Sequence, residues 1–224
     1  PLEYADTKFL EHHLNFIEAI CNVLHQGEIA AFGGLKSWLD CIDSPKGWLM
    51  VKPLCPEVQN RLGGLPIFQL SADVLHEFEL PAQYIVVVEN IQAGLALPKL
   101  KDSIVICGGG KNVAWLEAPW LQNKTVCYWG DIDSEGLYIL SMVRAKLPKV
   151  AALMMDEATL IEFQNKMVNE PDSIFFEPEY LMPQELILFR NLRNNKFYGR
   201  RLEQERITNS WVKQHVSAWR WNSA

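Results

Sequence analysis

A continuous apolar run passes directly into a pair of aspartates in the stretch Thr125-Val126-Cys127-Tyr128-Trp129-Gly130-Asp131-Ile132-Asp133. An apolar run without polar alternation is typical of a strand that is buried on both faces of a parallel sheet. Similar runs occur over 84–88, 104–107 and 151–155. Helical stretches are predicted between and after these runs, at about 111–120, 134–147 and 157–168. This alternation predicts an α/β fold with a parallel sheet covered by helices on both faces.

The rest of the chain extends this unit at both ends. Apolar spacing predicts a helix over 7–26, the run Trp48 to Val51 predicts a strand, and residues 71–79 predict a short helix capped by Ser71. The end of the chain, over about 183–221, is predicted to be mostly helical. We therefore expect a connector of helix and short strands over 1–80, the α/β domain over 81–182 and a helical C-terminal extension over 183–224.

Polar residues follow three of the predicted strands. Glu89 follows the first, the loop Gly108-Gly109-Gly110-Lys111 follows the second, and Asp131 and Asp133 follow the third. Ligands gather at the carboxyl ends of the strands in open α/β sheets, so we expect these residues to lie close together. Residues i and i+2 of an extended segment point to one side, so Asp131 and Asp133 can share a cation, with Glu89 as a third oxygen ligand. Oxygen ligands without His or Cys suit Mg²⁺ or Mn²⁺ rather than zinc.

Each of these features also has a plainer interpretation. A lone D-x-D motif is more often a solvated turn or a helix cap, and a glutamate after a strand often lies beside a helix N-cap. A loop lysine such as Lys111 is usually only solvated. The glycine loop lacks the G-x-G-x-x-G spacing, so we predict no dinucleotide site. The order of the three features within one α/β unit is what favours a common site.

Composition excludes several classes of protein. With 49% hydrophobic and 21% charged residues, the chain does not have the composition of a disordered protein. No apolar run reaches the roughly 18 residues that a membrane-spanning helix needs. No signal peptide is recognised, and five scattered cysteines without a C-x-x-C motif favour reduced thiols. We therefore expect a cytoplasmic protein that does not interact with membranes.

The net charge of −6 is unevenly distributed, because residues 185–224 hold eight basic and only three acidic residues. The candidates for contacts with nucleic-acid phosphates in this segment are Arg190, Arg193, Lys196 and Arg200. On a helix, Arg190, Arg193 and Lys196 form one stripe, and Phe189 faces the body of the protein. The alternative is a solvated basic face that only aids solubility.

The ordered set of strand-Glu, strand-glycine loop and strand-D-x-D resembles the Toprim domain of topoisomerases, primases and related nucleases. Longer strings extend the resemblance to the C-terminal half of the JetD family, the nuclease subunit of the Wadjet anti-plasmid system, which is similar to the A subunit of type IIB topoisomerases. These strings are Asp6-Thr7-Lys8-Phe9-Leu10-Glu11, Val88-Glu89-Asn90, Tyr128-Trp129-Gly130-Asp131-Ile132-Asp133-Ser134-Glu135-Gly136, Leu153-Met154-Met155-Asp156-Glu157-Ala158-Thr159-Leu160 and Arg201-Leu202-Glu203-Gln204-Glu205-Arg206-Ile207. The resemblance implies a Toprim-like parallel sheet, a homodimer, and cleavage of double-stranded plasmid DNA delivered by an SMC-kleisin motor complex.

The resemblance also assigns roles to individual residues. Asp131 and Asp133 are expected to hold Mg²⁺ or Mn²⁺, and Glu89 is expected to act as a metal ligand, as a general acid or base, or as both. Lys111 is a candidate for a phosphate contact, and Asp156, at the end of the fourth strand, is a candidate for an additional or supporting ligand. Toprim topoisomerases use a tyrosine nucleophile, but the only tyrosine upstream of the sheet is Tyr4. We therefore expect hydrolysis by metal-activated water.

Two rival functions and one structural alternative stay open. The D-x-D motif followed by Ser134-Glu135-Gly136 resembles haloacid-dehalogenase phosphatases, although two strands precede it here and none would be expected. A non-catalytic DNA-binding adaptor with a vestigial acidic site is the other rival. In the C-terminal segment, Glu203 and Glu205 alternate with Arg200, Arg201 and Arg206, which we interpret as an ion-pair network on a helix rather than as part of the site.

Overall fold

The computed structural model describes residues 8–41, 45–170 and 174–223, and the chain divides into two compact units, Pro1–Ser44 and Pro45–Ala224. The first unit contains α1 (Phe9–Leu24), α2 (Glu28–Ala31) and α3 (Leu35–Trp38). Ile29 and Leu35 are its buried residues. The helix predicted over 7–26 is confirmed as α1. Residue 7 and Tyr4 lie outside the described residues.

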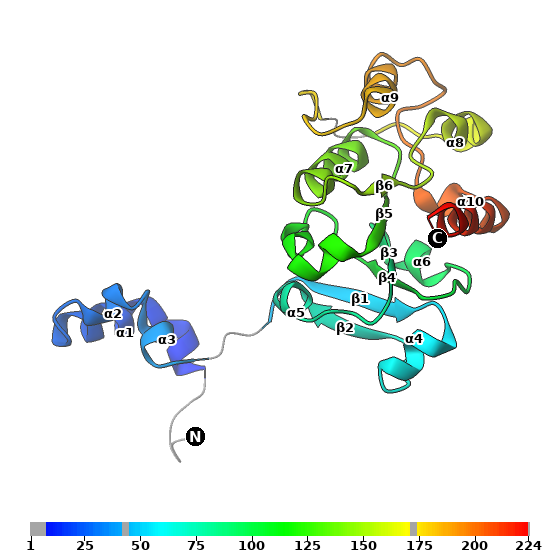
Figure 1. The fold of residues 1–224 in the computed structure, drawn as a ribbon. Coiled ribbons are helices and arrows are strands. Elements are labelled where there is room, and N and C mark those ends of the chain that lie inside the picture. The colour runs from blue at the N-terminus through cyan, green and yellow to red at the C-terminus, as the bar shows by residue number, and fades with distance from the viewer. Residues whose placement is uncertain (1–7, 42–44, 171–173, 224) are drawn as a thin grey trace. The chain divides into compact units, whose positions relative to one another are not determined.

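A mixed sheet forms the centre of the second unit (Figure 1). Its strands are β1 (Trp48–Pro53), β2 (Phe68–Ser71), β3 (Tyr84–Val88), β4 (Ser103–Cys107), β5 (Thr125–Trp129) and β6 (Ala151–Ala152). They lie in the order β2-β1-β4-β3-β5-β6. Strand β3 pairs in parallel with β4 and β5, and β5 pairs in parallel with β6, whereas β1 is antiparallel to both of its neighbours. The predicted α/β fold class and the buried strands over 84–88, 104–107 and 125–129 are confirmed.

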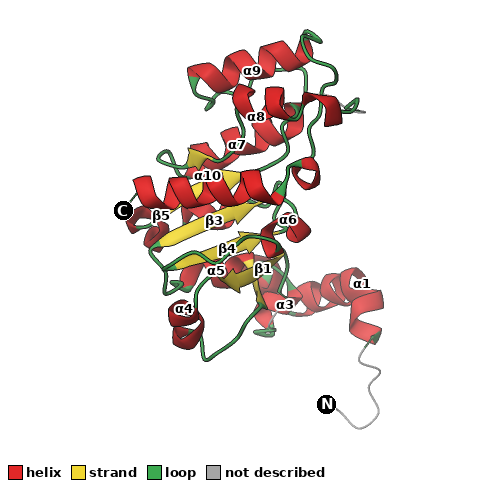
Figure 2. Cartoon of the chain, turned by 90° about the vertical axis from the view of Figure 1, so that its right-hand side faces the viewer, coloured by secondary structure: helices red, strands yellow, loops and turns green. Residues whose placement is uncertain are grey.

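Helices cover both faces of this sheet. They are α4 (Pro56–Arg61), α5 (Ala72–Glu77), α6 (Ile91–Leu95), α7 (Ser134–Lys146), α8 (Glu157–Glu162), α9 (Pro183–Arg193) and α10 (Asn209–Asn222). In Figure 1, α6 and α10 lie on one side of the sheet, and α5 and α7 lie on the other. Figure 2 views the face that α10 crosses. Large buried side chains such as Trp115, Tyr128 and Trp129 fill the core.

Two predicted elements, a helix and a strand, differ clearly from the structure. The helix predicted over 111–120 is wrong: the chain forms two 3₁₀ turns, Ala114–Glu117 and Pro119–Asn123. Pro119 is the physical reason, because a proline disfavours helical backbone at the residue before it, and Ala118 is extended with φ −52° and ψ 126°. The strand predicted over 151–155 is only two residues long, and Met154 has a left-handed φ of +55° that interrupts the extended run.

The short helices match the sequence to different degrees. The helix predicted over 71–79 is confirmed as α5, and the Ser71 side chain caps it by accepting a hydrogen bond from the Val74 N–H at 3.4 Å. Helix α8 ends at Glu162, earlier than the predicted 168, and a 3₁₀ turn follows at Gln164–Lys166. The C-terminal part is helical in α9 and α10, but most of the segment between them is not.

Strands β1 and β2 fall within the stretch 1–80 that the sequence analysis assigns to a connector, yet they are hydrogen-bonded into the same sheet as β3 to β6. The three-part division of the chain stays a prediction. Within residues 8–41, 45–170 and 174–223, no helix has the length and apolar character to cross a membrane.

Helix α6 packs against β4 through Gly94, whose absent side chain permits the close approach. A Cβ atom at this position would lie 2.7 Å from both Cβ and Sγ of Cys107. We expect Gly94→Ala to lower the free energy of unfolding by about 1–3 kcal/mol, the usual range for overpacking, although alanine favours helix. Chemical denaturation measures this change. Gln92→Ala, on the exposed side of the same helix, is the control and should change stability by less than about 0.5 kcal/mol.

Candidate functional site

The register of β3 and β5 places Glu89 beside Asp131. Val88 lies opposite Trp129, and the Glu89 N–H continues the ladder by donating to the Trp129 carbonyl at 3.0 Å. The Glu89 carboxylate accepts a hydrogen bond from the Asp131 N–H at 3.4 Å. Burial raises the pKa of Glu89, and the charge of Asp131 raises it further. Glu89 therefore holds a proton more readily than an exposed glutamate does.

The two aspartates lie on the turn between β5 and α7. Asp133 is the N-cap of α7 and accepts a hydrogen bond from the Gly136 N–H at 2.7 Å. A Cβ at Gly136 would lie 2.1 Å from the Asp131 carbonyl oxygen, so only glycine fits this turn. Asp131 and Asp133 are 8% and 3% exposed. The sequence thus folds locally so that two carboxylates are buried at the carboxyl end of one strand.

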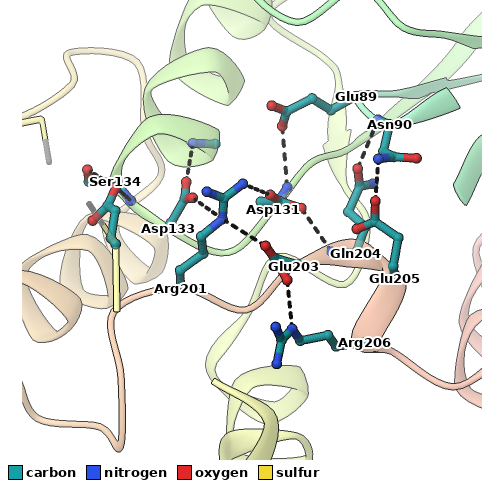
Figure 3. Close-up of polar contacts among 12 residues, drawn as sticks. Glu89, Asn90, Asp131, Asp133, Ser134, Arg201, Glu203, Gln204, Glu205 and Arg206 are labelled. Carbon is teal, nitrogen blue, oxygen red and sulfur yellow. Dashed lines mark hydrogen bonds and ion pairs between the residues drawn. The ribbon is translucent and has the colours of Figure 1, made fainter. Parts of the chain in front are cut away.

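The side chains of Asp131 and Asp133 meet at the same guanidinium group (Figure 3). Arg201 Nη2 donates a hydrogen bond to Asp131 Oδ2 at 2.8 Å, and Arg201 Nε lies 3.3 Å from Asp133 Oδ2. Glu203 Oε1 lies 3.9 Å from the same Nε. The two aspartates face a common positive charge, and in this structure that charge belongs to Arg201 of the protein itself. That they share a metal cation stays a prediction.

Asp133 is the most strongly perturbed carboxyl group of the site. Burial raises its pKa to about 7, and the negative charges of Glu170 and Asp131 act in the same direction. The hydrogen bond from Gly136 and the charge of Arg201 oppose this shift but do not cancel it. Glu170 is itself buried and accepts hydrogen bonds from the N–H, at 3.1 Å, and the hydroxyl of Ser134. Asp133 therefore holds a proton more readily than an exposed aspartate does.

A segment from the far end of the sequence completes the site through its main chain. Leu202 and Ile132 form an antiparallel bridge with hydrogen bonds of 2.9 and 3.0 Å. The Gln204 N–H donates to Asp131 Oδ1 at 2.9 Å, and the Gln204 side chain bonds the Trp129 carbonyl and the Asn90 N–H, both at 3.0 Å. Gln204 is 1% exposed and thus ties the ends of β3 and β5 together.

These contacts correct the earlier interpretation of this segment. The helix predicted around Glu203 and Glu205 is wrong, because the chain forms bridges at Arg201 and Leu202 and then a 3₁₀ turn over Gln204–Arg206. The predicted ion pairing is present, since Arg206 Nε lies 2.7 Å from Glu203. Sequence reasoning missed Arg201 and Gln204 as site residues. The only available signal was the specific R-L-E-Q-E-R-I string itself.

Two other candidates lie at the edge of the site with partners of their own. Lys111 Nζ pairs with Glu135 at 2.7 Å, and both side chains are about half exposed. The hydrogen bond and the charge of Glu135, and more weakly the charge of Glu89, raise the pKa of Lys111. Asp156 is the N-cap of α8 and accepts from the Thr159 N–H at 2.7 Å. The structure therefore uses Asp156 in helix capping, and its part in metal binding stays a prediction.

The stripe predicted for Arg190, Arg193 and Lys196 is wrong, because only the first two lie on a helix. Arg190 and Arg193 lie on α9, where Arg190 makes two hydrogen bonds of 2.7 Å to Glu177 and Arg193 bonds the Phe175 carbonyl. Lys196 lies beyond the helix, which ends at Arg193 and is followed by Asn195 at a φ of +53°. Arg200 lies farther along, where its N–H bonds the Val168 carbonyl at 3.0 Å. Phe189 is buried, as expected.

The donor set suits a hard divalent cation, although the metal-free geometry is not that of a finished metal site. Within the described ranges, no three His, Cys, Asp or Glu side chains gather closely enough to hold a metal ion. Asp131 and Asp133 nevertheless direct one oxygen each at a common positive group, and Arg201 Nε is buried there without a hydrogen-bond partner among the described residues. Carboxylate oxygens are the kind of ligand that Mg²⁺ and Mn²⁺ prefer, and metal binding by Asp131 and Asp133 stays a prediction.

The fold and the site together define a mixed α/β protein with a buried acidic centre at the carboxyl ends of parallel strands. Residues 34–216 match the family described as Wadjet protein JetD, C-terminal. The chain therefore belongs to this family, which confirms the resemblance of its sequence strings and places it in the Wadjet system. No curated protein matches the chain.

The raised pKa of Asp133 predicts a pH dependence of stability in the metal-free protein. A carboxyl whose pKa rises from 3.8 unfolded to about 7 folded binds its proton more tightly in the folded state. Its contribution to the free energy of unfolding is therefore full below about pH 4 and is lost as the pH rises to about 7. Asp133→Asn keeps the cap but removes this titration.

We therefore expect the stability of Asp133→Asn relative to wild type to increase between pH 4 and pH 7, as measured by denaturant unfolding in a chelator. Carboxyl groups that do not interact with Asp133 titrate alike in both proteins and cancel in the difference. Gln92→Ala, which removes no titratable group, is the control and should show a flat difference. A flat difference for Asp133→Asn as well would contradict the assigned pKa.

Proposed function

We propose that this chain is the catalytic part of a Mg²⁺- or Mn²⁺-dependent endonuclease that hydrolyses plasmid DNA within the Wadjet system. The observation that carries the proposal is the convergence of Asp131 and Asp133 on one positive charge, with Glu89 hydrogen-bonded beside them. This is the arrangement that the Toprim resemblance implies, one glutamate and a D-x-D pair at the ends of neighbouring strands. The family membership supports a place in the same system.

The mechanism assigns a task to each carboxylate. A divalent cation supplies Lewis acidity toward a phosphate oxygen and a water molecule when it is bound. Asp131 and Asp133 would hold that cation through their Oδ2 atoms, which both face the Arg201 guanidinium group in this structure. Glu89, with its raised pKa, exchanges a proton with the attacking water or the leaving oxygen. Gln204 holds Asp131 Oδ1, so that Oδ2 stays directed into the site.

The surroundings of the site bear on DNA binding. Lys111, at the edge of the site, is proposed to contact a phosphate oxygen, and Lys196 and Arg200 are proposed to contact the DNA backbone. Arg190 and Arg193 are weaker candidates than the sequence indicated, because their guanidinium groups already bind Glu177 and Phe175. Homodimerisation and docking to SMC-kleisin subunits, in the cytoplasm, complete the proposal.

The adaptor alternative gains one observation. Arg201 already occupies the space between the two aspartates, as a counter-ion would in a site that no longer binds metal. No observation supports the phosphatase alternative, because β3 and β4 precede the strand that ends in the D-x-D motif, whereas that class would have none before it. Metal binding separates the nuclease from the adaptor.

Asp131→Asn should reduce Mn²⁺ binding at least about tenfold, because it removes one of two anionic oxygens from a site that has no His or Cys to replace it. Isothermal titration calorimetry at pH 8 measures this affinity. Asp156→Asn retains the α8 cap and should leave the affinity unchanged if Asp156 only caps the helix. Equal Mn²⁺ binding by wild type and Asp131→Asn would contradict the nuclease proposal and favour the adaptor.

Glu89→Gln keeps the shape of the side chain but removes its charge and its proton-accepting capacity. We expect cleavage of circular plasmid DNA by the assembled Wadjet complex in Mn²⁺ to fall by at least about a hundredfold, the lower range for loss of a general acid or base. Glu117→Gln, at an exposed ion pair with Lys146, is the control and should cleave normally. Cleavage by Glu89→Gln at the wild-type rate would assign Glu89 a structural role.

A further inference from the structure

Arg201 is the one cationic group that the structure places between the two aspartates among the described residues (Figure 3). Its backbone is fixed by a bridge to Val168, whose N–H donates to the Arg201 carbonyl at 2.9 Å. Its side chain is 32% exposed, whereas the aspartates it contacts are buried. The backbone of Arg201 is thus fixed, whereas its side chain can move toward solvent.

The guanidinium group is poorly satisfied where it lies. Its one side-chain hydrogen bond among the described residues is the 2.8 Å contact with Asp131, and Nε approaches Asp133 and Glu203 without forming one. Arg144 offers a contrast within the same molecule. Its side chain is 7% exposed and makes two hydrogen bonds to Glu185 and one to the Tyr180 carbonyl, although its Nε is also unpaired. Arg144 therefore has the contacts of a structural arginine, and Arg201 does not.

The charges at this point do not allow two cations at once. A divalent ion bound to Asp131 Oδ2 and Asp133 Oδ2 would occupy the position that the guanidinium group now takes, and the two positive charges would repel each other within a few ångströms. One occupant must leave before the other binds. The arginine is the mobile one, because it is tethered by a long flexible side chain.

We propose that Arg201 is an exchangeable counter-cation, which neutralises Asp131 and Asp133 in the metal-free protein and leaves them when a divalent cation binds. This inference rests on the proposed metal site. Arg201 is thus a positioning residue. Its positive charge offsets the repulsion between the two buried carboxylates and holds their Oδ2 atoms in place until the metal binds. Metal binding is weakened by this competition, so the site fills only when the cation outcompetes the protein's own arginine.

The inference predicts that removal of the arginine strengthens metal binding. Arg201→Gln should bind Mn²⁺ about fivefold or more tightly than wild type at pH 8 in calorimetry, the lower end of typical coupling between competing ligands. Arg201→Lys keeps the competing charge and should stay close to wild type. Arg206→Gln is the matched control, because Arg206 lies in the same segment and pairs with Glu203 but not with the aspartates.

A purely structural role for Arg201 predicts the opposite order, with weaker Mn²⁺ binding in Arg201→Gln than in wild type. Unchanged or weaker binding in that variant, while wild type binds Mn²⁺, overturns the inference and leaves the proposed function standing. No binding by either protein contradicts the proposed function and the inference together.

A second measurement, by NMR, follows the arginine side chain in the wild-type protein. In ¹⁵N-arginine-labelled wild type, the Nε–H signal of Arg201, assigned by its absence from Arg201→Lys, should be protected from solvent exchange in chelator. Saturating Mg²⁺ should shift this signal and abolish its protection, while the Arg206 signal stays unchanged. An Arg201 signal that is the same with and without Mg²⁺ overturns the inference.

Discussion

Parallel pairing of β3 with β5 is the constraint on which the acidic site depends. Because Val88 lies opposite Trp129, the residues that follow the two strands come together, and Glu89 accepts a hydrogen bond from the Asp131 N–H. A shift of one residue in this register would turn the side chains to opposite faces of the sheet. The buried apolar residues of both strands fix the register, so the core that stabilises the fold also aligns the carboxylates.

Charge balance is the second physical feature of the site. Burial disfavours the ionised form of Asp133 and raises its pKa, and the negative charges of Glu170 and Asp131 act in the same direction. The hydrogen bond from the Gly136 N–H and the charge of Arg201 oppose this effect. The offset is incomplete, as the raised pKa of Asp133 indicates. The nuclease proposal and the proposed exchange of Arg201 rest instead on geometry, because Asp131 and Asp133 converge on this one guanidinium group.

The sequence predicted the parts of the structure that depend on local patterns. Continuous apolar runs located β3, β4 and β5, and the residues after each run located Glu89, Asp131 and Asp133 at one end of the sheet. The sequence did not predict Arg201 and Gln204 as site residues. They come from a segment about seventy positions along the chain, which a main-chain bridge brings to the site, and no local periodicity reveals such a contact. The alternating charges of Arg201, Glu203 and Arg206 in this segment matched a helical ion-pair pattern equally well. The 3₁₀ turns before β5 were not predicted, because the apolar pattern there is helical and one proline prevents the helix.

Anomalous diffraction from crystals grown with Mn²⁺ tests the account most directly, because it locates the metal and the arginine in one experiment. The account predicts an anomalous peak within coordination distance of one oxygen each from Asp131 and Asp133, with the Arg201 guanidinium group moved away from both. A peak elsewhere, or no peak at this position with Arg201 still between the aspartates, would contradict it.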